Sequence, residues 1–420
     1  MELIITTSNN YFTEEIMQRI EGGIVVVSFD MAKKLPRLKL NTDIYCLINL
    51  NQNIQGYDGK NIMTIIRDIK DIPKNRPMFI LDLFHETVQK IYLISMDNEY
   101  KQDDRLKNFV ITEKNKESCI TKTSLIKTLN GEWEYLSLLS KILSEGVDCI
   151  GRNGGTKSLF VEHLKFDLRN GFPLLTTKKM YIRGIVEEFM FFIRGNTDST
   201  ILSERNVHIW EGNTSKDFIK SRGLPYAQGV MGPMYGYQWR HFGAEYKCNE
   251  YGKPILDGIG GIDQLRNVIQ LIKTDPNSRR ILMTTYNPQQ AEEGVLYPCH
   301  SISIQFYVDG DNLDMFCFNR SQDTFLGVPY NIASSSLLLM VVAKITKKQP
   351  RYLKLTMGDV HLYQDHLVQA REQCSRIPYK FPVLSIPEID TIEELEKCET
   401  RDFVLLEYTS HQPIIAKMII

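Results

Sequence analysis

The stretch Leu296–Tyr297–Pro298–Cys299–His300 places a cysteine directly after a proline, in a connection between two apolar runs. These runs, residues 280–286 and 301–308, have the composition of strands. We therefore expect the connection to present Cys299 to a cavity instead of packing it in the face of a sheet. Taken alone, a Pro-Cys-His sequence is most often a buried structural cysteine, so the interpretation depends on the motifs around it.

Two motifs downstream favour a reactive cysteine. They read Phe318–Asn319–Arg320–Ser321–Gln322–Asp323 and Leu326–Gly327–Val328–Pro329–Tyr330–Asn331–Ile332–Ala333–Ser334. A guanidinium near a thiol favours the thiolate, which is the form that attacks carbon. Cys299 is therefore a candidate nucleophile, and Arg320 is a candidate for its activation.

Length and composition predict a globular protein of two domains, or of one large domain with an appendage. The chain has 420 residues, 43% of them hydrophobic and 24% charged, and a formal net charge of -1, which argues against a polyanion-binding surface. No apolar run is long enough to span a bilayer. The eight cysteines are dispersed, without CxxC pairs, which indicates free thiols and no zinc site. We expect a cytoplasmic protein that binds no metal and no membrane, with nucleic acid at most a secondary partner.

The first part of the chain, residues 1–117, alternates strand-like and helical segments, which predicts a small α/β domain. A helix is expected at residues 62–72, before Pro73. Strands are expected at residues 23–29, 43–50, 78–83 and 90–95. The polar residues that follow predict a linker over residues 118–131.

An amphipathic helix at residues 132–143 begins the second domain, residues 132–420. Residues 151–158 form a Gly-rich loop that carries Arg152, a pattern that is only weak support for phosphate binding. An apolar helix at residues 185–193 carries the adjacent carboxylates Glu187 and Glu188. At least one of them must be paired or functional if both faces of the helix are buried, and a surface pair at the helix edge is the alternative.

Aromatic, Gly-punctuated segments at residues 208–213 and 232–240 suit the walls of a pocket for planar ligands, although core packing would use the same residues. Ser278–Arg279–Arg280, after a helix at residues 262–273, is an anion clamp or a solvated edge. A strand at residues 358–363 would place His361 and Tyr363 on one face.

From about Glu132 to Ile420, these segments resemble thymidylate synthase in nearly every hallmark and in the same order. The resemblance implies that family's fold, a large mixed sheet with surrounding helices, preceded here by the small α/β domain. It implies reductive methylation of dUMP to dTMP with 5,10-methylenetetrahydrofolate as cosubstrate and dihydrofolate as by-product. By motif match, the Cys299 thiolate adds to uracil C6. The other catalytic groups implied are Glu188, Tyr235, His300 and Arg320.

The resemblance also implies ligands for both substrates. The residues matched to dUMP are Arg152, Arg279, Arg280, Arg320, Ser321, Asn331, His361 and Tyr363. The residues matched to the folate are Trp210, Asn213, Asp323, Gly327 and Ile420, which belongs to a closing tail. Arg279 and Arg280 match arginines that the partner subunit inserts, so a homodimer is implied. Asn319 departs from the pattern, because this family usually has glutamine before the arginine.

The first domain weakly resembles the last strands of dihydrofolate reductase, through Met78–Phe79–Ile80–Leu81 and Gln89–Lys90–Ile91–Tyr92–Leu93–Ile94. Asp82–Leu83 stand where that family has a Gly-Gly pair beside its nicotinamide cofactor, so NADPH binding is not expected. We expect a truncated domain without reductase activity, as a relic of a bifunctional dihydrofolate reductase-thymidylate synthase. An unrelated α/β appendage is the alternative.

Three other functions stay open at this point. They are a pyrimidine deoxynucleotide hydroxymethylase of the same fold, a bifunctional enzyme with an active reductase, and a non-catalytic RNA-binding or scaffold protein. Asn331 favours uracil over cytosine, because relatives that act on cytosine carry aspartate there. The methyl or hydroxymethyl product is not decided by this residue.

Overall fold

The computed structural model describes residues 2–6, 90–94, 119–121, 131–151, 153–376 and 378–419. The chain divides into two compact units, residues 1–140 with 370–380, and residues 141–369 with 381–420. The domain boundaries predicted from the sequence, at residues 117 and 132, stay predictions.

In the first unit, three short strands form one sheet. Strand β1 (Glu2–Thr6) pairs in parallel with β2 (Lys90–Ile94), which pairs antiparallel with β3 (Cys119–Thr121). Strand β2 confirms the strand predicted at residues 90–95, whereas β3 lies within the segment predicted to be a linker. The strands predicted at residues 23–29, 43–50 and 78–83, and the helix at 62–72, lie outside the described residues.

Helix α5 (Glu132–Glu145) confirms the predicted amphipathic helix. Its apolar residues Trp133, Leu136 and Ile142 are buried. The helix ends at Gly146, where an added Cβ would lie 2.4 Å from the carbonyl oxygen of Ile142. A residue with a side chain would therefore clash with the last turn.

The second unit contains most of the described elements. Its strands are β4 (Val147–Gly151), β5 (Gly154–Asp167), β6 (Leu282–Thr284), β7 (Ser303–Asp309), β8 (Asn312–Asp323), β9 (Gln349–Tyr363), β10 (Val383–Ser385) and β11 (Val404–Leu406). Its α-helices are α6 (Ile182–Ile193), α7 (Thr200–Glu204), α8 (Lys216–Ser221), α9 (Gly236–His241), α10 (Gln264–Thr274), α11 (Gly327–Ile345) and α13 (Ile392–Lys397). Helix α12 (Leu367–Cys374) crosses the boundary between the units, and short 3-10 turns lie at Leu168–Asn170, Ala291–Glu293, Gln364–His366 and Thr400–Asp402.

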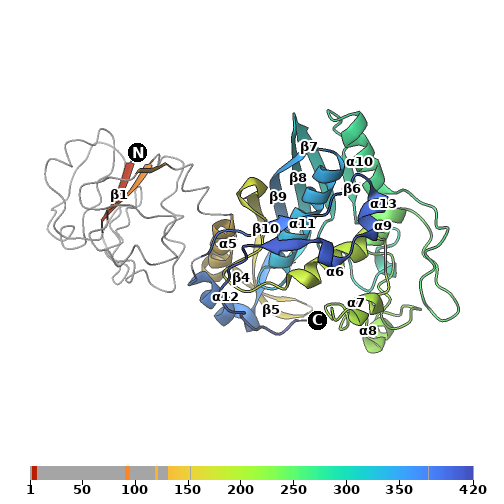
Figure 1. The fold of residues 1–420 in the computed structure, drawn as a ribbon. Helices are drawn as coiled ribbons and strands as arrows, with labels where there is room; N and C mark the ends of the chain where they lie inside the picture. Colours follow the sequence, from red (N-terminus) through yellow and green to blue (C-terminus); the bar gives the residue numbers. More distant parts are fainter. Residues whose placement is uncertain are drawn as a thin grey trace. The chain divides into compact units, whose positions relative to one another are not determined.

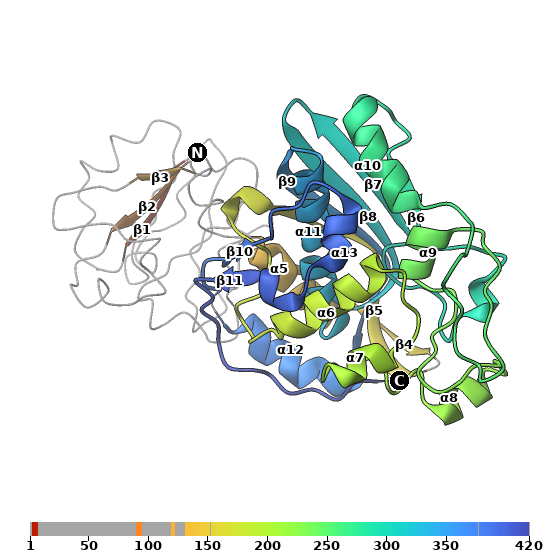
Figure 2. The same cartoon turned by 45° about the vertical axis from the view of Figure 1, so that its right-hand side comes forward.

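The large sheet has the strand order β4-β5-β9-β8-β7-β6, with β8 and β9 parallel and the other neighbours antiparallel. The predicted mixed sheet with surrounding helices is confirmed. Helix α11 packs on β8 and β9, and α6 packs on α11, so the helices form layers on one side of the sheet (Figures 1 and 2). The predicted Gly-rich loop is wrong for most of its length, because residues from Gly154 onward belong to β5.

Helix α11 is long and apolar enough to cross a membrane, contrary to the sequence analysis, which found no such run. Most of the helix is buried inside the protein. Burial against the sheet and α6 accounts for its apolar composition.

The opposite face of the sheet carries exposed apolar side chains. Leu282 on β6 lies beside Gln305 on β7, which lies beside Phe316 on β8, so the three residues share one face. Leu282, Phe316 and Tyr307 are exposed. This face contrasts with the side that the helices cover.

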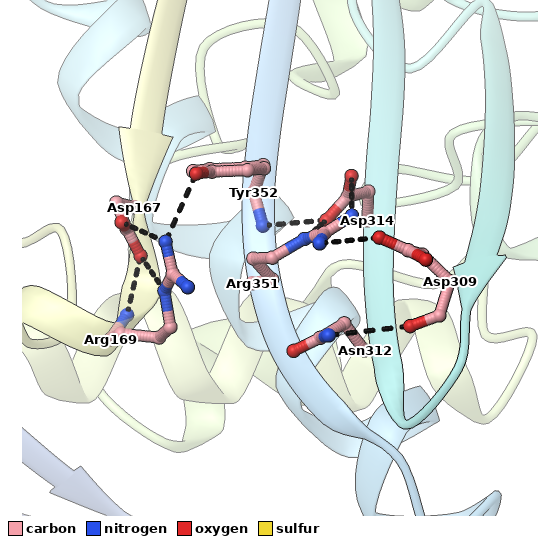
Figure 3. A network of polar contacts seen from close by, with 7 residues as sticks. All are labelled: Asp167, Arg169, Asp309, Asn312, Asp314, Arg351 and Tyr352. Atoms are coloured by element: carbon pink, nitrogen blue, oxygen red, sulfur yellow. Dashed lines mark hydrogen bonds and ion pairs between the residues drawn. The ribbon is translucent and has the colours of Figure 1, made fainter.

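A polar network fixes the register of the sheet where β8 begins (Figure 3). The pairing of β8 with β9 shifts between Leu313 and Met315, and the intervening Asp314 is buried. The Arg351 guanidinium donates to both carboxylate oxygens of Asp314, at 2.8 and 3.0 Å, and the Tyr352 N–H donates to Asp314 Oδ1 at 3.1 Å. The side chain of Asp314 thus replaces the ladder hydrogen bonds that the irregularity removes.

Helix α9 begins in close contact with α6. An ideal Cβ on Gly236 would lie 2.3 Å from the carbonyl oxygen and 2.5 Å from the Cα of Phe192. Both obstacles belong to the backbone of α6, so neither can rotate away. The absence of a side chain at Gly236 sets the position of Tyr235, which precedes the helix.

We expect Gly236→Ala to lower the free energy of unfolding by about 2 kcal/mol, because α6 and α9 must move apart. Urea unfolding followed by circular dichroism measures this change. Gly260→Ala is the control, because nothing lies within 4 Å of its added Cβ, and its effect should stay within about 0.5 kcal/mol. Equal stability of the two variants would contradict the close approach.

Candidate functional site

The connection that carries Cys299 is held to strand β8 by backbone hydrogen bonds. The carbonyl oxygen of Cys299 accepts the N–H groups of Arg320 at 2.8 Å and Ser321 at 3.2 Å. The Nε of Arg320 also donates to the carbonyl oxygen of Pro298 at 3.2 Å. Cys299 and Arg320, which the sequence analysis paired as nucleophile and activator, are therefore neighbours.

Cys299 is bonded to Tyr235 through two groups. The Cys299 N–H donates to Tyr235 Oη at 3.3 Å, and its Sγ lies 3.4 Å from the same oxygen. Because Tyr235 Oη accepts the N–H, its own O–H can be directed at Sγ, where it would stabilise a thiolate. Tyr235 is buried and has a φ of 41°, which is uncommon for a residue other than glycine.

Burial controls the charge of the nucleophile. It raises the pKa of the Cys299 thiol, while the hydrogen bond with Tyr235 and the positive charge of Arg320 oppose the rise. Arg320 acts in the direction that the sequence predicted, but burial outweighs it. The protonated thiol is therefore the resting form at neutral pH.

His300 stacks on Tyr235, with ring centroids 4.3 Å apart and planes at 16°. Burial lowers the pKa of His300 to about 4, so the ring is neutral at physiological pH. Its Nδ1 lies 3.2 Å from the Oγ of Ser301, whose φ of 54° turns the chain into β7. A neutral imidazole can accept or donate one proton beside the thiol.

Glu188 is joined to this cluster through Trp210. The indole Nε1 of Trp210 donates to Glu188 Oε1 at 2.8 Å, and the Trp210 and Tyr235 ring centroids are 5.9 Å apart. Burial raises the pKa of Glu188 to about 7, against the opposing effect of the Trp210 hydrogen bond. Glu188 can therefore both take and give a proton near neutral pH.

The adjacent Glu187 has a structural partner. It is buried, and its Oε2 accepts from Arg205 Nη1 at 3.1 Å. The same Arg205 nitrogen donates to Glu399 at 2.6 Å. Both carboxylates of the pair thus have partners, and the alternative of a surface pair at the helix edge is wrong.

The end of strand β8 brings a second group of predicted residues together. Asp323 is the pairing partner of His361 on β9, and the rings of His361 and Tyr363 are in contact, with centroids 5.2 Å apart. The prediction that His361 and Tyr363 share one face of a strand is confirmed. Asp359 Oδ1 lies 3.0 Å from His361 Nδ1 and orients the ring.

Asn331, in the first turns of α11, belongs to a chain of amides that the sequence analysis did not identify. Its Nδ2 donates to Gln322 Oε1 at 2.9 Å, and Asn319 Nδ2 donates to the same oxygen at 3.3 Å. Asn319 and Gln322 are buried. Gln322 stands within the quoted motif of residues 318–323, but the sequence analysis gave it no role.

Other predicted residues lie apart from the cluster or outside the described residues. Arg279 and Arg280 are exposed between α10 and β6, and within residues 131–419 no described contact joins them to Cys299. Arg152 and Ile420 lie outside the described residues. Asn213 is half-buried in the turn after Trp210.

The residues matched to the folate suit a flat ring that carries N–H donors. The N–H groups of Phe325 and Leu326 both donate to Oδ1 of Asp323, which leaves Oδ2 as an acceptor. A Cβ on Gly327 would lie 3.6 Å from the Cβ of Asp323, an ordinary contact distance, so Gly327 lies directly beside this residue. Among the described residues, no group of three or more His, Cys, Asp or Glu could hold a metal ion.

The sequence model of the thymidylate synthase family matches residues 133–420. A bifunctional dihydrofolate reductase-thymidylate synthase from Leishmania major is 42% identical over 292 residues, which are 68% of this chain and 55% of that protein. The thymidylate synthase of varicella-zoster virus (strain Dumas) is 43% identical over 305 residues, which are 72% of this chain and 98% of the viral protein. The chain thus spans little more than half the length of the bifunctional relative and nearly all of the viral one.

The raised pKa of Glu188 predicts that stability falls as the pH rises. An unfolded glutamate loses its proton near pH 4.5, whereas Glu188 in the folded protein loses it at about 7. Between these values the folded state holds more protons, so the free energy of unfolding decreases with rising pH, and the decrease is complete above about pH 7. Between pH 5 and 8, we expect the wild type to lose about 2 kcal/mol more than Glu188→Gln.

Urea unfolding at several pH values measures this difference. The exposed Glu250→Gln should keep the pH dependence of the wild type. If the free energy of unfolding changed with pH to the same extent in Glu188→Gln and in the wild type, Glu188 would ionise like an ordinary glutamate.

Proposed function

The chain belongs to the thymidylate synthase family, and from this premise we propose that it methylates dUMP reductively to dTMP, with 5,10-methylenetetrahydrofolate as cosubstrate. The observation that carries the proposal is the cluster around Cys299. The phenol of Tyr235 contacts both the Cys299 thiol and the neutral imidazole of His300, and the Trp210 indole joins it to the Glu188 carboxyl group of pKa about 7. A nucleophilic thiol next to groups that can exchange protons suits covalent catalysis with several proton transfers.

Cys299 supplies the nucleophile. Its thiolate adds to C6 of the uracil ring, which makes C5 a nucleophilic carbon, and the thiolate is expelled again when the product forms. Tyr235 donates a hydrogen bond to Sγ and stabilises both the attacking and the departing thiolate. Arg320 adds positive charge beside the thiol, and we propose that it also binds the dUMP phosphate together with Arg152 and Ser321.

Proton transfer falls to the other members of the cluster. Glu188, with a pKa of about 7, exchanges a proton with the O4 side of the uracil ring through water. Tyr235 stays protonated because burial raises its pKa well above the usual value. It can therefore take part in removing the C5 proton only by giving up its own proton at the same time. His300 stacks on the Tyr235 ring and keeps a neutral imidazole beside it.

The folate binds against Trp210, Asn213, Asp323 and Gly327, and the tail ending at Ile420 closes over it. When bound, it supplies the one-carbon unit and the hydride. Asp323 accepts N–H donors of the pterin through Oδ2, while its bonds to Phe325 and Leu326 hold the carboxylate in place. Trp210 contributes a flat wall whose position is fixed by its bond to Glu188.

We propose a homodimer in which Arg279 and Arg280 complete the phosphate site of the partner subunit. Both arginines are exposed next to β6, at the edge of the sheet. The uncovered sheet face that begins there exposes Leu282, Tyr307 and Phe316. A second copy on this face would bury the apolar residues and carry the arginines to the other active site.

The first domain is proposed to lack reductase activity, since Asp82 and Leu83 stand where a nicotinamide cofactor would need close contact with the backbone. The proposal for this domain depends on the sequence alone. It is tested together with the synthase reaction.

The decisive assay incubates the whole protein with dUMP and methylenetetrahydrofolate, with and without NADPH. We expect dTMP and an equal amount of dihydrofolate, which persists in the presence of NADPH. Consumption of NADPH in step with dihydrofolate would establish a bifunctional enzyme, and a hydroxymethyl product by mass would establish a hydroxymethylase. Cys299→Ala should bind dUMP normally but turn over below about one thousandth of the wild-type rate.

Cys248→Ala is the matched control, because Cys248 is a half-buried thiol in another loop, and it should keep full activity. Turnover by Cys299→Ala would contradict the mechanism. Loss of activity in both variants would point to a general effect on the fold.

The shared active site predicts complementation between two inactive variants. In a mixed dimer of Cys299→Ala and Arg280→Ala, one of the two sites has both an intact cysteine and an intact donated arginine. After random exchange of equal amounts of subunits, half of the dimers are mixed, so activity should recover to about a quarter of the wild type. Activity after mixing, unfolding and refolding measures this recovery.

Cys299→Ala mixed with Asn331→Ala is the control, because both changes affect residues contributed by the subunit's own chain. Every site in that mixture lacks one group, so no activity should return. Recovery in the control, or none in the first mixture, would refute the donation of Arg280 to the partner.

A further inference from the structure

The amides of Asn319, Gln322 and Asn331 form a continuous hydrogen-bonded chain that ends on backbone groups. Asn319 and Gln322 lie near the end of β8, and Asn331 lies in α11. Asn319 Nδ2 and Asn331 Nδ2 both donate to Gln322 Oε1, at 3.3 and 2.9 Å. Gln322 is thus the link between the strand and the residue matched to the pyrimidine ring.

Backbone groups fix the direction of the chain. The Ser301 N–H can only donate, and it donates to Asn319 Oδ1 at 2.7 Å. The Ser321 carbonyl oxygen can only accept, and it accepts from Gln322 Nε2 at 2.9 Å. The oxygen of Gln322 must therefore face the Nδ2 groups of Asn319 and Asn331.

Cys317 supports the same direction. Its Sγ donates to Asn319 Oδ1 at 3.3 Å, and burial raises the pKa of this thiol to about 11, so it stays a donor at neutral pH. Burial of Asn319 and Gln322 leaves little room for water to replace these bonds. If the Asn319 amide were reversed, its Nδ2 would face the Ser301 N–H and the Cys317 S–H, and both hydrogen bonds would be lost.

The orientation of Asn331 decides which base its amide can complement. Uracil presents an N3–H donor next to the O4 acceptor, whereas cytosine presents an N3 acceptor next to the N4 amino donor. An amide that rotates by half a turn exchanges its oxygen and nitrogen and could bind either base. If Asn331 rotated, its Oδ1 would face Gln322 Oε1, which places two acceptors together.

We infer that Gln322 is a positioning residue that holds the amide of Asn331 in the uracil-selective orientation. The inference depends on the proposed function, because it assumes that Asn331 contacts the pyrimidine. Asn319 is one methylene shorter than the glutamine usual in this family, and Gln322 supplies the longer amide that reaches Asn331. Selectivity for uracil in this chain thus requires Gln322 in addition to Asn331.

The test measures the dissociation constants of dUMP and dCMP by calorimetry, with dCMP measured in competition where it binds weakly. In Gln322→Met, whose side chain has the same length without the amide, the preference for dUMP over dCMP should shrink about tenfold. In Gln322→Glu, whose carboxylate can only accept from Asn331, the preference should stay near that of the wild type. In an Asn331→Ala background, Gln322→Met should cause no further change.

An unchanged preference in Gln322→Met, or equal weakening of both nucleotides, would overturn the inference. If Gln322→Met is insoluble, Gln322→Ser replaces it, because serine is too short to reach Asn331. The preference for dUMP over dCMP should then shrink to the same extent, and an unchanged ratio of the two dissociation constants would overturn the inference. Gln270→Met, on the exposed side of α10, is the control and should leave both constants unaltered.

Binding separates this inference from the proposed function. If the wild-type protein makes no dTMP but loses its preference for dUMP in Gln322→Met, the proposed function is refuted and the positioning role of Gln322 is retained. If the wild-type protein makes dTMP and Gln322→Met keeps the preference for dUMP over dCMP, only the positioning role of Gln322 is refuted.

Discussion

The structure of the site depends on one carbonyl group. The oxygen of Cys299 accepts the N–H groups of Arg320 and Ser321, so the connection that carries the nucleophile is fixed to the end of β8 by backbone bonds. The Sγ of Cys299 is then placed beside Tyr235, whose own position follows from the close contact of Gly236 with α6. Strand, connection and helix thus meet at the thiol, where the side chains of Tyr235 and Arg320 add bonds to the connection.

Burial has the same electrostatic effect on every titratable member of the cluster. It raises the pKa of Cys299, Glu188 and Tyr235 and lowers that of His300, so each favours its neutral form. A neutral site has a small electrostatic cost in the folded protein, because no unpaired charge is buried. Charge then appears in steps during the reaction, and Glu188, with its pKa of about 7, is the group that gives or takes a proton most easily near neutral pH.

The sequence predicted the strands on either side of Cys299, the helices that became α6 and α10, and most members of the cluster, because the motifs keep their order and spacing. It did not predict that Arg205 binds Glu187. The same Arg205 nitrogen also binds Glu399, 194 residues further on, so this ion pair belongs to a contact between distant parts of the chain that no local motif indicates. It also missed Gln322. Side chains alternate between the two faces of a regular strand, so residues 319 and 322 are expected on opposite faces. The hydrogen bond between Asn319 and Gln322 forms near the end of β8 and was therefore not expected.

A close backbone contact also holds β9 against β8 beside the nucleophile. An added Cβ on Gly358 of β9 would lie 2.7 Å from the carbonyl oxygen of Arg320, so β9 can approach β8 here only with glycine. This contact lies at the residue whose N–H holds Cys299. The nucleophile is thus placed by the backbone, and the amides of Asn319 and Gln322 connect Ser301 with Asn331. Asn319 with the longer Gln322 makes this connection, which requires both the direction of the hydrogen bonds and a side chain at residue 322 long enough to reach Asn331.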